Sequence, residues 1–192
     1  MQSKQDMKAF VINLLNSNLP PVYYYHNYKH TLYVLEKAIE IGEAENCSEQ
    51  EMKLLSAAAL WHDTGYIKTY KDHEAAGCEL ASKYLPAYGF LEDDINKVCG
   101  MIMATKIPQS PHTKLEEIIA DADLEYLGTA GASIIADNFY KELLSMNPQF
   151  TVEEWNKTQI SFILQHHYFT LYCKENKEPL KQAYLNALMN EI

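Results

Sequence analysis

The apolar residues of this chain recur three or four positions apart almost throughout, and this spacing constrains the fold more than any other feature. Representative sets are Leu32, Leu35 and Ile39; Ile135, Phe139 and Leu143; and Trp155, Ile160, Ile163 and Leu164. Residues at this spacing share one face of an α-helix, whereas a half-buried strand alternates apolar and polar residues. Such alternation is hard to find here, so the sequence predicts an all-α fold.

Proline, glycine and capping residues divide the chain into eight or nine predicted helices. Pro20-Pro21 ends the first, the segment 106–112 is a loop, and Ser48 with Glu51 forms a capping box, as does Thr151 with Glu154. The predicted ranges are near 3–17, 27–46, 49–63, 73–86, 91–105, 114–126, 130–146, 152–169 and 177–190. With no repeat, low-complexity run or Gly/Ser linker, residues 1–192 are expected to form one domain.

Composition and charge exclude several classes of function. The chain has 192 residues, 47% of them hydrophobic, and a formal net charge of -10, which argues against general binding of nucleic-acid duplexes. No apolar run is long enough to span a membrane, and we interpret the N-terminus as a first helix rather than an export signal. The four cysteines are widely spaced, which favours free thiols and a cytoplasmic location.

The segment YHNYKH, residues 25–30, contains two histidines four positions apart, His26 and His30. On a helix, four residues make about one turn, so both rings would project from one face. The pair is either a metal and acid–base site or only the polar start of an ordinary helix. These six residues alone leave both interpretations open.

Two further segments supply partners for these histidines. LWHDTGY, residues 60–66, places His62 and Asp63 at the end of an apolar helix that Gly65 is expected to terminate, and IADADLEYLG, residues 119–128, contains Asp121 and Asp123. A mixed set of imidazoles and carboxylates suits a divalent ion such as Mn, Co, Fe, Ni or Zn, and Mg less well. Positions left open on such an ion hold water and a substrate oxygen.

The order His30, His62-Asp63, Asp123 resembles the signature of the HD superfamily of metal-dependent phosphohydrolases, and the resemblance extends from about residue 22 to about residue 185. HDTGY, HEAAG and IIADADLEYLG are similar to segments of that family. The resemblance implies a helical bundle in which His30, His62, Asp63 and Asp123 bind the metal. Asp123 fits the family's Ala-Asp-Leu pattern, so Asp121 is expected nearby, orienting a ligand or a water.

The resemblance also implies a reaction. Family members that cleave cyclic nucleotides carry a similar YHN…H segment, whose first histidine is the general acid. By this likeness His26 protonates the leaving oxygen, while the ion that Asp63 helps to hold activates the attacking water. The expected substrate is a small phosphate mono- or diester, most simply a nucleotide. A homodimer is expected only because dimers are common.

The segment DHEAAG, residues 72–77, adds His73 and Glu74 as lower-ranked site residues, which either line the site or bind a weak second ion. Thr105 stands where two-metal members of the family carry another histidine. His166 and His167 end a late helix, where they either have a structural role or close the pocket. Four lysines also lie near the motifs: Lys68, Lys71, Lys106 and Lys114. The alternatives are a di-iron oxygenase of the same superfamily and a non-catalytic nucleotide-binding regulatory domain.

Overall fold

A computed structural model describes residues 6–190, and in this part of the chain it contains ten α-helices, three short 3-10 helices and no strand. The all-α prediction is confirmed. The α-helices are α1 (Met7–Asn18), α2 (Tyr28–Ala44), α3 (Glu49–Trp61), α4 (His73–Tyr84), α5 (Glu92–Ala104), α6 (Lys114–Asp123), α7 (Ala132–Met146), α8 (Val152–Gln165), α9 (Leu171–Asn176) and α10 (Glu178–Met189). The 3-10 helices are η1 (Thr64–Ile67), η2 (Leu85–Tyr88) and η3 (Glu125–Gly128).

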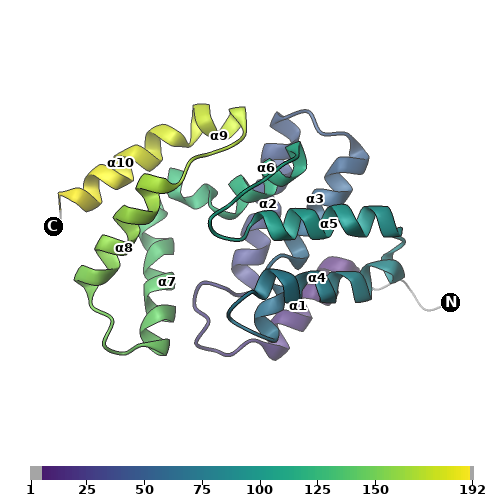
Figure 1. Cartoon of the computed structure of the whole chain (residues 1–192), viewed down its shortest axis with the longest axis horizontal. Coiled ribbons are helices and arrows are strands. Elements are labelled where there is room, and N and C mark those ends of the chain that lie inside the picture. The colour runs from purple at the N-terminus through teal and green to yellow at the C-terminus, as the bar shows by residue number, and fades with distance from the viewer. Residues whose placement is uncertain (1–5, 191–192) are drawn as a thin grey trace.

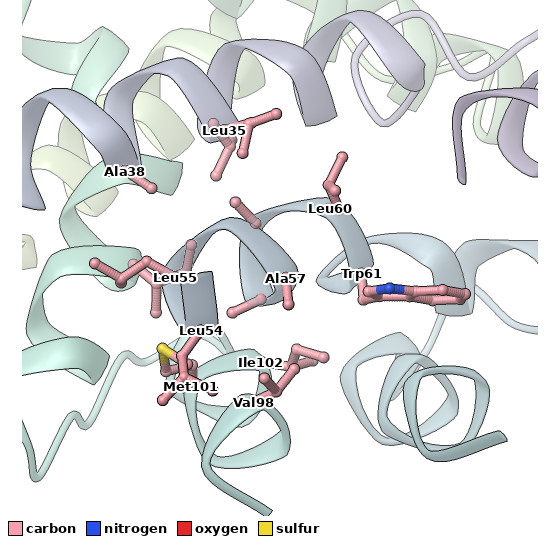
Figure 2. Packing of buried hydrophobic residues seen from close by; sticks show 14 of the residues in the cluster. Leu35, Ala38, Leu54, Leu55, Ala57, Leu60, Trp61, Val98, Met101 and Ile102 are labelled. Carbon is pink, nitrogen blue, oxygen red and sulfur yellow. The ribbon is translucent and has the colours of Figure 1, made fainter. Parts of the chain in front are cut away.

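Helix α3 is the centre of the main hydrophobic core. Its last eight residues include three alanines in a row, Ala57, Ala58 and Ala59, and all three are fully buried. A helix that is apolar on every side must be surrounded by other helices. Figure 2 shows α3 between Leu35 of α2 and Val98 of α5, with side chains interdigitating from both sides. The core therefore fixes the end of α3, where the HD pair lies.

A second, smaller cluster involves the C-terminal helices. Leu124, directly after α6, and Leu127 of η3 pack with Ile163 of α8 and Leu185 of α10. Figure 1 shows the corresponding arrangement, with α1 to α6 on one side of the molecule and α7, α8 and α10 on the other. The segment from α6 through η3 connects the two clusters, so Asp123, where α6 ends, lies between them.

Two glycines bring α4 against the end of α3. A Cβ atom on Gly65 would lie 1.8 Å from the backbone oxygen of His73, and one on Gly77 would lie 3.1 Å from the backbone oxygen of His62. No side chain fits at the first position without a shift of the backbone. The glycines of HDTGY and HEAAG therefore allow a close approach that places His73 beside Asp63.

The helix boundaries differ from the predicted ones in several places. Helix α3 ends at Trp61, before the expected Gly65, and α8 ends at Gln165, four residues before the expected 169. The short helix α9, residues 171–176, was not predicted. Residues 3–5 of the first predicted helix lie outside the described residues. None of the helices within residues 6–190 is both long enough and apolar enough to cross a membrane.

Candidate metal centre

Four side chains from three helices converge at one end of α3. One nitrogen each of His30 and His62 and one carboxylate oxygen of Asp123 all lie within 4.8 Å of one another and could hold a metal ion. The His30 Nε2 atom is 2.9 Å from Asp123 Oδ1. Asp63 Oδ2 joins the group at 3.2 Å from His62 Nε2 and 3.5 Å from His30 Nε2. The structure thus brings together the four residues that the sequence predicts as ligands.

The backbone explains how neighbouring residues reach the same point. His62 caps α3, and Asp63 then leaves the helical conformation, with φ −97° and ψ 1°. This change of direction lets His62 and Asp63 face the same site, although adjacent residues within a helix point about 100° apart. Asp123 is likewise the last residue of α6. Because His30 lies in the first turn of α2, all three ligand-bearing segments present their ligands at helix ends.

The buried polar atoms of the HD pair fit a metal ion. His62 Nδ1 is 2.8 Å from the carbonyl oxygen of Ala59, to which it can donate a hydrogen bond, and this turns Nε2 toward the site. Within the described part of the chain, His62 Nε2 and Asp63 Oδ2 are buried and have no hydrogen-bond partner. Buried polar atoms without a partner are costly. A cation at this position would satisfy both atoms.

The electrostatics of the cluster also favour a cation. Burial opposes ionisation of Asp63, but the adjacent imidazoles, His62 first, hold its pKa well below the usual range. Burial acts on Asp123 in the same way, and hydrogen bonds from His30 and His62 lower its pKa. For His62, the nearby carboxylates outweigh burial and raise the pKa. Both carboxylates therefore remain charged near neutral pH and give the site a negative potential.

His26 lies beside this cluster but is not on the helix of His30. Asn27 caps α2, which begins at Tyr28, so His26 precedes the helix, and the expectation that both rings share a helical face is wrong. Glu142 of α7 holds His26 instead. Its Oε1 is 2.5 Å from His26 Nδ1, and its Oε2 accepts the backbone N–H groups of Tyr25 and His26 at 2.9 and 3.0 Å.

Glu142 was not predicted from the sequence. It lies 116 positions from His26 in a helix that carries no recognisable motif. The available signal was a lone acidic residue on the apolar face of that helix, between Phe139 and Leu143. Glu142 is fully buried in the structure. An isolated buried carboxylate needs a partner, and this one has the His26 ring.

His73 and Glu74 approach the site from the start of α4. His73 Nε2 is 3.5 Å from Asp63 Oδ1 and 3.7 Å from Glu74 Oε1. The ring of Tyr66 stacks on His73, with centroids 3.8 Å apart, and lies 4.3 Å from the His26 ring. The three rings form one continuous wall of the site.

A cavity of about 280 Å³ opens from these residues. His26, Asp63, His73, Glu74 and Asp123 line one part of it. The remainder is lined mainly by aromatic and aliphatic side chains from η3, α7 and α8. Two of the candidate ligands, Asp63 and Asp123, and the candidate acid His26 therefore face a common space between the two hydrophobic clusters.

The structure does not bring Asp121 to this cluster. Its carboxylate accepts hydrogen bonds from the backbone N–H groups of Phe169 and Thr170, at 2.9 and 2.8 Å, and from the Thr170 hydroxyl at 2.6 Å. Two residues on a helix that are two positions apart point roughly 200° away from each other, so Asp121 and Asp123 cannot both face the site. Asp121 instead anchors the segment between α8 and α9.

Most of the other polar residues near the motifs lie away from the cavity. Lys68 pairs with Glu79 at 2.9 Å and Lys106 with Asp72 at 2.6 Å. His166 contacts Lys181, and neither His166 nor His167 lines the cavity. Thr105 does line it, with its hydroxyl donating to the carbonyl oxygen of Ile102. No lysine is among the described residues that line the cavity.

Comparison with known proteins agrees with this geometry. A predicted HD superfamily hydrolase from an uncultured Thermotogales bacterium has a similar structure, with a TM-score of 0.60 and 22% sequence identity over 95% of this chain and 91% of that one. No curated protein matches. The model of the HD domain matches residues 27–126, just over half of the chain and the part that carries all four candidate ligands. The chain belongs to the HD domain family.

Proposed function

We propose that this protein is a metal-dependent phosphohydrolase that cleaves a small phosphate mono- or diester, in the simplest case a nucleotide. The observation that carries the proposal is the cluster of His30, His62, Asp63 and Asp123, with two buried atoms that lack a hydrogen-bond partner within residues 6–190 and that a cation would satisfy, at the wall of a ligand-sized cavity. The fold is shared with a predicted hydrolase, which supports the same class of reaction. The four free thiols suit a reducing compartment such as the cytoplasm.

Each residue of the site has a distinct role in this proposal. When bound, a divalent ion supplies an acidified water and polarises a phosphoryl oxygen. His30, His62, Asp63 and Asp123 fix its position. His26 donates Nδ1–H to Glu142, so Nε2 is the nitrogen that delivers a proton to the leaving oxygen. Glu142 keeps the ring in that orientation.

The test is release of inorganic phosphate or alcohol from a panel of nucleotides and simple phosphate esters, with Mn²⁺ or Co²⁺ added. We expect turnover by the wild-type protein and a loss of about 10²-fold or more in His26→Gln for esters with poor leaving groups. Lys97→Gln, a change in the middle of α5, serves as the control and should keep full activity.

Two results would contradict the proposal. Oxygen uptake with two irons per chain would favour an HD-type oxygenase. Nucleotide binding without hydrolysis under every metal would favour a regulatory domain that has kept the fold.

A further inference from the structure

The cavity beside the candidate metal centre has two chemically different ends. At one end lie the carboxylates of Asp63, Glu74 and Asp123 together with His26 and His73. At the other end, Phe139, Trp155, Phe162 and Ile163 form an apolar wall. A substrate that fills the whole cavity must therefore have one charged part and one apolar part.

The apolar end begins at His26. The His26 and Phe139 rings are perpendicular, with centroids 5.3 Å apart, and Phe139 meets Trp155 in a T-shaped contact at 5.7 Å. Trp155 is itself stacked on Tyr140 and only 6% exposed, so the wall is held in place. A group that receives a proton from His26 lies directly against Phe139. The leaving group, rather than the phosphate, would occupy the apolar end.

The charges around the cavity limit how many phosphates a substrate can carry. Three carboxylates line it, and among its lining residues there is no lysine, while the sequence contains no arginine at all. One divalent ion would not fully offset three carboxylates. A chain of two or three phosphates extending away from the ion would meet aromatic rings where it needs cations.

We infer that the cavity selects substrates with a single phosphorus group esterified to an aromatic or otherwise apolar alcohol, and that it discriminates against nucleoside di- and triphosphates. This inference rests on the proposed phosphohydrolase function for the identity of the charged group. A volume of about 280 Å³ suits one small organic phosphate and lies just below the usual range for ligand cavities, roughly 300–1,000 Å³.

Phosphonates test the inference separately from catalysis, because their carbon–phosphorus bond is not hydrolysed. Binding of benzylphosphonate, methylphosphonate and methylenediphosphonate would be measured by calorimetry with excess Mg²⁺. Burial of one phenyl ring should make benzylphosphonate bind roughly ten- to a hundredfold more tightly than methylphosphonate. The diphosphonate should bind no more tightly than methylphosphonate.

A matched pair of variants on α8 locates the effect. Thr158 is exposed and lines the cavity, whereas Ser161 is exposed on the same helix and does not line it. Thr158→Lys should weaken benzylphosphonate binding and strengthen diphosphonate binding, each by about fivefold or more through one added charge. Ser161→Lys should change neither.

Equal affinity for benzyl- and methylphosphonate, absence of benzylphosphonate binding, or preference of the wild-type protein for the diphosphonate would overturn the inference. Failure of the proposed function appears differently, as absence of ester hydrolysis by a protein that still prefers benzylphosphonate.

Discussion

At the scale of single residues, His62 and His26 of the candidate site differ in the group that accepts a hydrogen bond from Nδ1. In His62 that partner is a backbone carbonyl, which accepts the Nδ1 hydrogen and turns Nε2 toward the cluster, where a bound cation would take the place of a second proton. In His26 it is the buried carboxylate of Glu142, which accepts the Nδ1 hydrogen and leaves Nε2 as the nitrogen for proton transfer. The partner atoms therefore assign one ring to metal binding and the other to proton transfer.

The role of Glu142 leads to a prediction about leaving groups. Glu142→Gln keeps a hydrogen-bonding side chain of the same length but removes the charge beside His26. We expect kcat for an alkyl phosphate ester to fall by about 10²-fold with little change in KM, because proton donation is impaired. A 4-nitrophenyl ester, whose leaving group needs no proton, should lose far less. An equal loss for both esters would show that Glu142 has only a structural role.

His166 makes stability depend on pH. Burial, followed by the charge of Lys181, lowers its pKa to about 3, whereas an unfolded chain has a histidine pKa of about 6.5. As the pH falls below 6.5, the unfolded chain binds a proton that the folded chain does not, so stability is lost. Between pH 7 and pH 5.5 this loss amounts to about 1 kcal/mol.

Denaturant unfolding at these two pH values checks the prediction. His166→Gln should reduce the pH dependence by about 1 kcal/mol, whereas His112→Gln, a change at an exposed loop position, should leave it as in the wild type. An unchanged pH dependence in the His166 variant would contradict the assignment.

At the scale of helices, the contact between α4 and the end of α3 positions His73. Gly65→Ala would force a backbone shift at His73, so we expect a loss of stability of about 2 kcal/mol or more. Gly77→Ala should cost less, since its nearest contact is at 3.1 Å, and Gly131→Ala, with its nearest neighbour at 3.8 Å, is the control. Thermal unfolding of the three variants would reveal this order. A Gly65 variant as stable as the Gly131 variant would disprove the close contact.

The hydrogen bonds of Asp121 connect α6 to the segment before α9. Asp121→Asn replaces one of the two carboxylate oxygens, which accept three hydrogen bonds, with an NH₂ group that cannot accept one. We expect the free energy of unfolding to fall by about 1–3 kcal/mol. Metal content should be unchanged, because Asp121 points away from the cluster. Elemental analysis beside a melting curve separates the two effects, and loss of metal at full stability would instead identify Asp121 as a ligand.

Most helices were predictable because their apolar spacing and caps are local signals. The short helix α9 was not predictable, since LYCKEN is too short for a periodic pattern. Its one local signal is the N-cap residue Thr170, whose side chain accepts a hydrogen bond from the backbone N–H of Cys173. The end of α8 was also missed, because no glycine or proline follows Gln165. Helix ends that are determined by tertiary contacts are difficult to predict from local sequence.

At the scale of the whole molecule, the candidate site lies where two hydrophobic clusters meet. The metal-binding motifs were recognisable because each ligand lies within a characteristic short segment. Glu142 and the aromatic wall were not, because they come from α7 and α8, whose residues approach His26 only after the helices have packed. The candidate metal ligands can therefore be predicted from short sequence motifs, whereas the shape of the cavity depends on how the helices pack.

The most direct test of the account is the metal content of protein purified without chelator. The wild type and Asp137→Ala, which changes an exposed residue of α7, should each contain about one transition-metal ion per chain, and Asp63→Ala should contain almost none. Circular dichroism would establish that all three proteins are folded. A folded Asp63→Ala protein that keeps its full metal content, or a wild-type protein that takes up no ion even from added Mn²⁺, would contradict the central claim.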